Sequence, residues 1–273
     1  MIDVVTLIPF YTSDLKDFEK ISLKRNLDIL SNYDFYFIAP FQLKTNYGFK
    51  KIIKEYNAKV MYFDNSFFKG INGYNRLLMQ KSFYKNFTKF NYILICQLDA
   101  LIIEDNLNFW VQQNYDYIGA PWIEEYKDNF FFDSMGNGGL SLRKVSKFIE
   151  VLDSKNFYFT NYKYHSTSLR SGLKNLFLLR VFKLSKNIGL QLRYVKLFIF
   201  FFKKNEDYFW AFFAKFFIGE FNLPSPSLAL KFSFEVSPRK CYLSNNQNLP
   251  FGCHAWQKYD KKFWEDFVLN KEK

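Results

Sequence analysis

The sequence has few cysteines and few histidines, and this excludes several kinds of site. Its 273 residues include three cysteines, far apart along the chain, and two histidines. Cys96, Cys241 and Cys253 form neither a CxxC metal motif nor a disulfide framework, so we expect small buried side chains in a reducing compartment. A metal hydrolase would need a cluster of histidines and carboxylates that the sequence does not contain.

Long uncharged apolar runs are also missing. A membrane-spanning helix needs about 20 consecutive apolar residues, whereas the run LFIFFF at 197–202 is short and has lysines on both sides. The first residues, MIDVVTLIPFY, carry no basic region and reach Pro9 too soon for a signal peptide. We therefore expect a cytoplasmic protein that begins with a strand.

Aromatic residues and positive charge are abundant instead. Hydrophobic residues make up 49% of the chain and aromatic residues 22%, which is enough to bury a substantial core and argues against disorder. We expect a single domain over residues 1–273. The formal charge of +12 indicates anionic surroundings, such as nucleotide phosphates, nucleic acid or an acidic membrane face.

Helix and strand patterns alternate along the chain. Short apolar runs predict strands at 3–8, 34–39, 59–63, 92–96 and 114–122. Helical spacing predicts helices at 14–30, with Ser13 or Asp14 as cap, and at 47–56, 74–87 and 208–217. A turn is predicted at 70–73, and a loop with a short strand at 223–234. The alternation favours an α/β fold with a mostly parallel sheet.

Asp99 stands between two apolar runs, at 92–96 and 101–103. A carboxylate in such a place is costly to bury without a partner. Asp99 either caps the helix or turn that follows, or lies at a strand's carboxyl end, where open α/β sheets bind ligands. The stretch alone leaves both interpretations open.

Residues 163–204 differ from the rest of the chain, since they hold ten lysines or arginines and no acidic residue. Basic amphipathic helices on an anionic membrane would have this composition. The alternative is a helical insertion that packs on the core and turns a basic face to solvent. The length of the acid-free stretch favours the membrane interpretation.

Two other groups of residues also have two interpretations each. Asn75, Arg76 and Lys81 are expected on the first turns of a helix. They either bind a phosphate there or are solvent-exposed surface residues. The glycines of 136–139 either let a ligand approach the backbone or form a hairpin turn. A plain turn would not explain the bracketing Asn137 and Arg143.

Glu206 and Asp207 end the basic stretch just before an apolar helix. They either cap that helix or supply a general base, and its N-terminus should lower the pKa of Asp207 and keep it ionised. His254 lies between glycine and tryptophan and is the better candidate ligand of the two histidines, although a lone histidine can equally be structural.

Five strings taken together resemble a bacterial family of GT-A-type glycosyltransferases that is catalogued as a domain of unknown function. They are QLDA at 97–100, DYIGAPW at 116–122, GNGGLSLR at 136–143, NED at 205–207 and PFGCHAW at 250–256. The strings occur in the family's order and cover most of the chain from about Tyr74 onward. The resemblance implies a GT-A-like, Rossmann-like sheet of mixed, mostly parallel strands flanked by helices, with 163–204 as a basic helical insertion.

The resemblance also implies roles for individual residues. Asp99 and His254 would hold Mn²⁺ or Mg²⁺, with Gln97 replacing the first Asp of the usual DxD motif. Asp207, or Glu206 beside it, would be the catalytic base. Nucleotide-sugar binding is expected from Thr6, Pro9, Tyr11, Asn75, Arg76, Lys81, Gln97 and Asp99. Sugar or acceptor binding is expected from Trp122, Asn137, Gly138 and Gly139.

The predicted function is therefore a nucleotide-sugar-dependent glycosyltransferase of the hexosyl type, inverting and metal-assisted, with a UDP-sugar as donor. Its acceptor would be a bacterial surface polysaccharide or a lipid-linked glycan, and the enzyme would lie on the inner face of the cell membrane. The alternative is a basic peripheral-membrane or nucleic-acid-binding protein without catalysis. Because the charge is concentrated in one stretch, membrane is favoured over nucleic acid.

Overall fold

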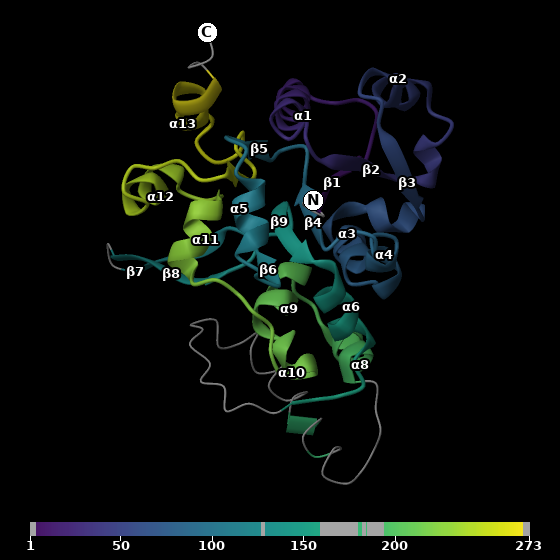
Figure 1. Ribbon diagram of the computed structural model, residues 1–273, viewed down its shortest axis with the longest axis vertical. Helices are drawn as coiled ribbons and strands as arrows, with labels where there is room; N and C mark the ends of the chain where they lie inside the picture. Colours follow the sequence, from purple (N-terminus) through teal and green to yellow (C-terminus); the bar gives the residue numbers. More distant parts are fainter. Residues whose placement is uncertain (1–3, 127–128, 159–179, 182–183, 185–193, 270–273) are drawn as a thin grey trace.

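The computed structural model describes residues 4–126, 129–158, 180, 181, 184 and 194–269 (Figure 1). Its centre is a six-stranded sheet in the order β3-β2-β1-β4-β9-β6. Four strands run parallel: β1 (Val4–Pro9), β2 (Asp34–Pro40), β3 (Lys59–Phe63) and β4 (Tyr92–Cys96). β9 (Leu140–Lys144) lies antiparallel between β4 and β6 (Tyr117–Ile118). The predicted mixed, mostly parallel sheet flanked by helices is confirmed.

Helices cover both faces of this sheet, because the side chains of each strand point alternately to the two faces. On one face, Ile8 and Phe37 pack with residues of α1 (Asp17–Ile29) and α2 (Tyr47–Glu55). On the other, Leu7 and Ile38 belong to a larger core. Helices that contribute to it include α3 (Gly70–Leu78), α4 (Lys81–Lys85), α6 (Val145–Asp153), α8 (Tyr194–Phe201), α9 (Glu206–Phe212) and α10 (Lys215–Ile218).

A second sheet of three two-residue strands lies beside the first. β11 (Gly252–Cys253) is at its centre, parallel to β10 (Ser233–Phe234) and antiparallel to β5 (Leu101–Ile102). A third apolar cluster joins this sheet to the C-terminal helices. The helices of this part are α5 (Leu107–Gln112), α11 (Pro226–Phe232), α12 (Pro238–Ser244) and α13 (Lys261–Trp264).

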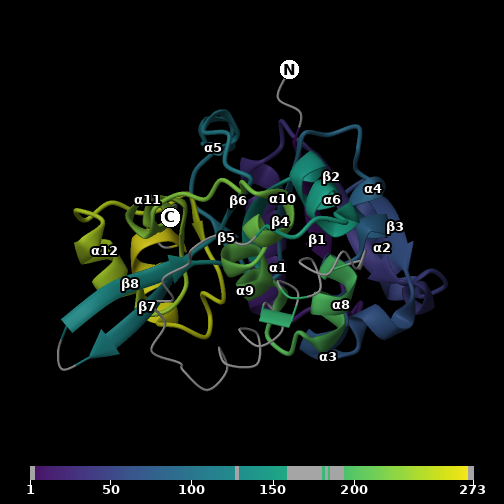
Figure 2. The same cartoon turned by 90° about the horizontal axis from the view of Figure 1, so that it is seen from below.

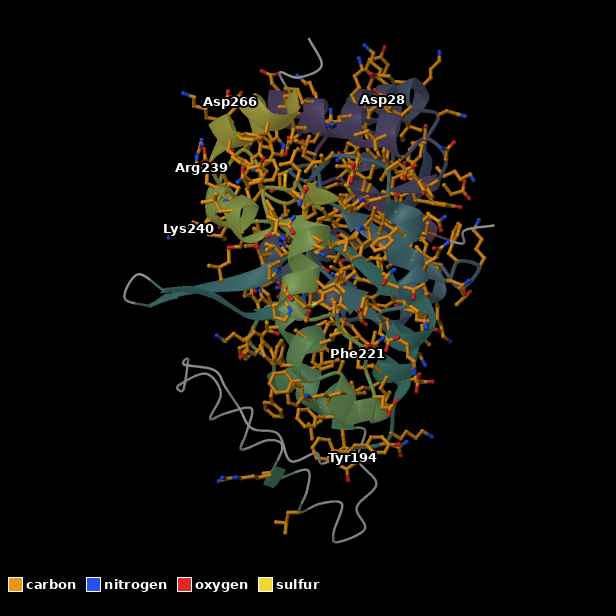
Figure 3. All side chains as sticks on the ribbon, turned by 60° about the vertical axis from the view of Figure 1, so that its left-hand side comes forward. Asp28, Tyr194, Phe221, Arg239, Lys240 and Asp266 are labelled. Atoms are coloured by element: carbon orange, nitrogen blue, oxygen red, sulfur yellow. The ribbon has the colours of Figure 1, made fainter. Side chains whose placement is uncertain are left out.

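The outline of the molecule is elongated. The antiparallel pair β7 (Pro121–Tyr126) and β8 (Asn129–Met135) extends from the body as an arm in both ribbon views (Figure 2). Asp28 of α1 and Asp266 lie toward one end of the molecule and Tyr194 of α8 at the other (Figure 3). Short helical turns complete the chain: η1 (Phe41–Leu43), η2 (Asn65–Phe68) and the π-helical η3 (Glu265–Leu269).

Two of the predicted strands, 59–63 and 92–96, have the observed bounds, but the predicted turn at 70–73 is wrong. These residues form the first turn of α3. A Cβ on Gly73 would lie 2.6 Å from the Ser66 carbonyl oxygen, so the glycine serves a close helix contact. The predicted helix over 74–87 is two helices, since the chain leaves the helical conformation at Met79 and Gln80.

Other boundaries also differ from the prediction. α1 begins at Asp17 rather than after Ser13 or Asp14, because the Glu19 carboxylate accepts the Lys16 N–H at 2.7 Å. The predicted strand 114–122 is divided between β6 and β7, and the predicted helix 208–217 between α9 and α10. Residues 223–234 are mainly α11, with the Ser225 hydroxyl as its N-cap.

Most of the basic stretch 163–204 lies outside the described residues, so its predicted amphipathic character stays a prediction. Its described end, α8, buries Tyr194, Val195 and Phe198 in the larger core. Phe200 and Phe201 on the same helix are 73% and 48% exposed. Within the described ranges, no helix has the length and apolar character needed to cross a membrane.

Candidate functional site

A cavity of about 510 Å³ opens at the carboxyl ends of β1 and β4. β2 and β3 lie on one side of β1, and β4, the next strand along the chain, lies on the other side. The strand order therefore reverses between β1 and β4, and open α/β sheets bind ligands at such a switch point. The lining comes from both sheets and from α3 and α9. It comprises Tyr11, Gly70, Ile71, Tyr74, Asn75, Gln97, Asp99, Asn137, Gly138, Gly139, Asn205, Glu206, Asp207, Glu235, His254 and Lys258.

The register of the small sheet brings three ionisable groups together. β10 and β11 pair in parallel through Phe234 and Cys253, so the residues that follow them, Glu235 and His254, lie side by side. β5 pairs antiparallel with β11, and the turn before it carries Asp99. Groups separated by more than a hundred residues therefore meet at one edge.

His254 is held through both ring nitrogens. Nδ1 lies 2.9 Å from the Glu235 carboxylate, and Nε2 lies 3.3 Å from Asp99 Oδ1 and 3.3 Å from Gln97 Oε1. Burial alone would lower the pKa of His254, but the hydrogen bonds and charges of Asp99 and Glu235 outweigh burial and raise it to about 10. Burial would raise the pKa of Asp99, and the His254 contact holds it below its usual range instead.

Helix α1 fixes the turn that carries Asp99. The Asn26 side chain donates to the Ala100 carbonyl at 2.9 Å and accepts the Ile102 N–H at 2.7 Å. Arg25 donates to the carbonyls of Ile102 and Ile103. The turn is therefore held by buried hydrogen bonds, and Asp99 is placed before any ligand binds.

The residues after His254 are held just as firmly. Ala255 has a φ of 51°, which an alanine adopts only when its surroundings require it. Trp256 is 1% exposed, donates its indole N–H to the Ser22 hydroxyl at 2.8 Å, and donates its backbone N–H to the Asp99 carbonyl. Ala255 and Trp256 therefore help to fix the position of the His254 imidazole.

The glycine loop packs directly against His254. The Asn137 side chain accepts the N–H groups of Gly139 and Leu140, which fixes the loop ahead of β9. A Cβ on Gly139 would lie 2.0 Å from His254 Nε2, and one on Gly138 would lie 2.9 Å from Glu206 Oε1. The glycines at both positions are thus required by close approach of side chains.

Gly139→Ala is expected to displace the His254 ring, because the added methyl group would occupy the position of Nε2. Any function that needs this nitrogen should fall by at least about tenfold, the lower end of the loss seen when a metal-binding imidazole is mispositioned. Titration of Mn²⁺ with and without UDP measures this loss. Unchanged binding would show that Nε2 contacts no ligand.

Gly138→Val would be a poor probe of ligand binding at this loop. Its Cβ would press on the Glu206 carboxylate, which forms a buried ion pair with Arg143. A loss of activity in this variant would therefore mix ligand contacts with stability.

Arg143 and Glu206 are 0% and 1% exposed and pair through both carboxylate oxygens, at 2.7 and 3.0 Å. Arg143 also donates to the Tyr84 hydroxyl and the Ser141 hydroxyl. Both Glu206 oxygens accept from Arg143, so this carboxylate is held in a buried ion pair, and Asp207 is the better placed of the two predicted bases. Four of the five Arg143 N–H groups are engaged in these contacts and the side chain is fully buried, so it is not placed to bind a phosphate.

Glu206→Gln is expected to lower the free energy of unfolding by about 3–5 kcal/mol, because it leaves the Arg143 charge buried without a counter-ion. Denaturant unfolding measures the change. The double substitution Arg143→Met with Glu206→Leu removes both charges and should destabilise less than Glu206→Gln alone. A double variant less stable than Glu206→Gln would contradict this account of the pair.

Asp207 differs from the expectation for a helix N-terminus. Burial, and then the charge of Glu206, raise its pKa to about 7, although its carboxylate accepts the Tyr208 N–H at 2.8 Å. Desolvation outweighs the helix dipole here, so the predicted lowering of this pKa is wrong. A cavity carboxylate with a pKa of about 7 is suited to accept a proton near neutral pH.

Five of the predicted binding residues lie outside this cavity. Thr6 and Pro9 are buried within β1. Arg76 donates to the Ser66 carbonyl, and Lys81 pairs with Asp153. Trp122 stacks on Tyr208 and Phe212 of α9. The other predicted site residues line it: Tyr11, Asn75, Gln97, Asp99, Asn137, Gly138, Gly139, Glu206, Asp207 and His254.

Six lining residues were not predicted as site residues: Gly70, Ile71, Tyr74, Asn205, Glu235 and Lys258. Glu235 follows a short apolar run much as Asp99 does, and this pattern could have identified it. Lys258 supplies a positive charge that contributes to lowering the pKa of Asp99. Tyr74 is buried in the larger core on α3 and also lines the cavity.

The fold and site define an α/β protein with a ligand cavity at the carboxyl edge of a mostly parallel sheet, lined by carboxylates, a histidine and a glycine loop. The chain belongs to the family described as "Protein of unknown function (DUF5672)", whose model matches residues 57–254. A sequence comparison with curated proteins gives no match.

Several solved structures are similar in part. The galactosyltransferase LgtC, in complex with donor and acceptor sugar analogues, is 12% identical with a TM-score of 0.44, over 93% of this chain and 86% of LgtC. A glycosyltransferase involved in the glycosylation of the major capsid of PBCV-1 is 11% identical with a TM-score of 0.41, over 96% of this chain and 97% of that one. At these TM-scores, neither likeness determines what the present chain binds.

Proposed function

We propose that the protein is a nucleotide-sugar-dependent glycosyltransferase of the hexosyl type, inverting and metal-assisted, with a UDP-sugar as donor. One observation carries the proposal. A fixed His254–Asp99 pair and the Asp207 carboxylate line the same cavity at the switch point of the sheet. Sugar transfer needs charge neutralisation at a leaving diphosphate and a base at the attacking hydroxyl, and these groups could supply both.

The donor atoms present fit a divalent cation. Nδ1 donates to Glu235 and Nε2 is turned toward Asp99 and Gln97, an arrangement that orients metal-binding imidazoles. With a pKa of about 10, Nε2 carries a proton in the free protein, and a cation would have to displace that proton to bind there. Carboxylate, amide and imidazole donors together suit Mn²⁺, and the two oxygens also suit Mg²⁺. Among the residues that the structure describes, no cluster of three or more His, Cys, Asp or Glu could hold a metal. A diphosphate would have to complete the coordination, and the bound cation would neutralise its charge.

In the proposed reaction, an acceptor hydroxyl oxygen attacks the anomeric carbon of the donor sugar on the face opposite the diphosphate. A carbon–oxygen bond forms to the acceptor as the bond to the diphosphate oxygen breaks, and that electron pair leaves with the nucleoside diphosphate. Asp207 takes the hydroxyl proton, and Asn137 and the glycines that follow it let the sugar approach the backbone. Lys258 adds positive charge at the cavity.

The proposed acceptor is a surface polysaccharide or a lipid-linked glycan, with the enzyme on the inner face of the cell membrane. The ten cations and absent acids of residues 163–204 support an anionic membrane as partner. Vesicle flotation is expected to show stronger binding to vesicles with acidic lipid than to neutral ones, and less binding at high salt. Equal binding to both kinds of vesicle would contradict an electrostatic membrane contact.

The donor is tested by hydrolysis and transfer assays with a panel of nucleotide sugars, with and without Mn²⁺. Turnover of one donor, lost in Asp99→Asn, is the expected result. If no donor is bound or turned over, and the protein instead binds DNA in a salt-sensitive way, the non-catalytic alternative would replace this proposal.

A further inference from the structure

A second cavity, of about 640 Å³, is lined by residues of α3 and of the end of α8, and it shares Asn75 with the first. Its apolar side is formed by Met79, Ile199, Phe200 and Phe202. Met79 and Phe202 are largely buried in the larger core, whereas Phe200 is 73% exposed at the rim. We call this cavity the α3–α8 groove.

Three cations line the α3–α8 groove: Arg76, Lys203 and Lys204. All three are exposed, and none of them makes a salt bridge with a described carboxylate. The groove therefore combines an apolar floor with three exposed positive charges, of which that of Arg76, after the hydrogen bonds from Ser66, also lowers the pKa of Asp64. A ligand that matches both is an anion attached to a hydrocarbon chain.

The groove and the catalytic cavity share one wall. Asn75 lines both, donates to the Asn205 side chain at 3.0 Å, and accepts the Glu206 N–H at 3.4 Å. Asp207 is the next residue. A molecule seated in the groove would therefore reach the proposed base by crossing a single side chain.

We propose that the α3–α8 groove binds the phosphate and the adjoining hydrocarbon of a lipid-linked acceptor, whose reactive hydroxyl crosses Asn75 into the cavity. This inference rests on the proposed function, of which it names the acceptor class. The groove presents one exposed aromatic face, that of Phe200, whereas a nucleic acid stacks successive bases on several, so a lipid is favoured. Arg76, expected at the nucleotide, is assigned here to the acceptor phosphate.

The test uses dodecyl monophosphate below its micelle concentration, titrated calorimetrically into the full chain. Inorganic phosphate tests the headgroup alone, and dodecyl maltoside tests the chain alone. Dodecyl monophosphate is expected to bind more tightly than either. Equal binding of inorganic phosphate or of dodecyl maltoside would overturn the proposal, because one half of the ligand would then suffice.

The triple variant Arg76→Glu, Lys203→Glu and Lys204→Glu should weaken this binding about a hundredfold, since each cation near a lipid phosphate contributes about a factor of five. The matched control reverses three exposed lysines of α2, Lys50, Lys51 and Lys54, and should bind as the wild type does. An equal loss in both variants would show that net charge, and not the groove, determines binding.

The apolar part is tested with Phe200→Ser, expected to weaken binding of dodecyl monophosphate about threefold or more through lost apolar contact. Leu243→Ser on α12, 67% exposed in the native protein, is the control and should change nothing. Unchanged binding in Phe200→Ser would contradict the proposal that the groove binds the hydrocarbon of the ligand.

Binding of UDP with Mn²⁺, measured on the same variants, separates the two proposals. It should be unchanged in the groove variants. If the wild type binds UDP with Mn²⁺ but the groove variants keep their affinity for dodecyl monophosphate, the groove assignment alone fails. If the wild type binds dodecyl monophosphate in the groove but no nucleotide sugar, the glycosyltransferase fails and the acceptor role with it.

Discussion

Asp207→Asn is expected to cut the transfer rate by at least about a hundredfold while leaving donor affinity nearly unchanged, because a positioned base contributes roughly 10²–10⁴ in rate. The pH profile gives a second readout. The pKa of Asp207 is raised to about 7, so the wild-type rate should rise with pH up to about 7 and level off above it. The residual rate of the variant should lack this rise.

The same substitution should make the protein more stable at high pH. The folded-state pKa of about 7 lies above the ordinary 3.8, so the folded protein binds the extra proton between these values. The wild type therefore loses stability as pH rises from about 4 to about 7, by at most about 4 kcal/mol, and asparagine does not. Denaturant unfolding should give similar stabilities near pH 4 and a more stable variant at pH 8.

These two readouts distinguish a base from a structural carboxylate. An Asp207→Asn variant that transfers sugar at the wild-type rate would place the base elsewhere, whatever its stability. A variant that is both inactive and less stable at pH 8 would indicate that the carboxylate holds the loop together.

His254→Ala is expected to weaken Mn²⁺-dependent binding of UDP by at least about a hundredfold, because it removes one of the three groups proposed to hold the cation. Glu235→Gln keeps the imidazole and changes only its support, so its loss should fall between about tenfold and a hundredfold. Calorimetry with UDP, and electron paramagnetic resonance of Mn²⁺, measure binding without any turnover.

Asp34→Asn serves as the control, since Asp34 is an exposed carboxylate paired with Lys59 on the far strands of the sheet. It should bind UDP and Mn²⁺ as the wild type does. Tight Mn²⁺-dependent binding in His254→Ala would contradict the metal proposal, and would leave the Asp99–His254–Glu235 contact as an ion-paired support for the fold.

The sequence predicted the sheet because its strands are short β-branched or aromatic runs, clear in 59–63 and 92–96. It predicted Asp99 as a candidate ligand because a carboxylate between two apolar runs is costly to bury without a partner. The antiparallel β9, and the two-residue strands β5, β10 and β11, carry no comparable signal. Their pairing is a product of tertiary packing, so the sequence could not show that Glu235 lies beside His254.

The two adjacent carboxylates show the same limit. Position at a helix start predicts a low pKa for Asp207, but burial decides otherwise, and burial depends on residues far along the chain. Nor could the sequence show that Arg143 forms an ion pair with Glu206, since 63 residues separate them. The sequence therefore identified candidate site residues from their chemical type, whereas their roles depend on burial and on partners that only the folded structure shows.

The residues that fix His254 in position determine which fragments of the chain could keep the site intact. The family match begins at residue 57 and ends at His254. β1 and β2, which provide two of the four parallel strands, precede that stretch, as do Ser22, Arg25 and Asn26. Ala255 and Trp256 follow it. A fragment cut at these limits would keep most of the recognisable residues and lose the parts that hold them in place, so the boundaries of sequence similarity are not the boundaries of a folding unit.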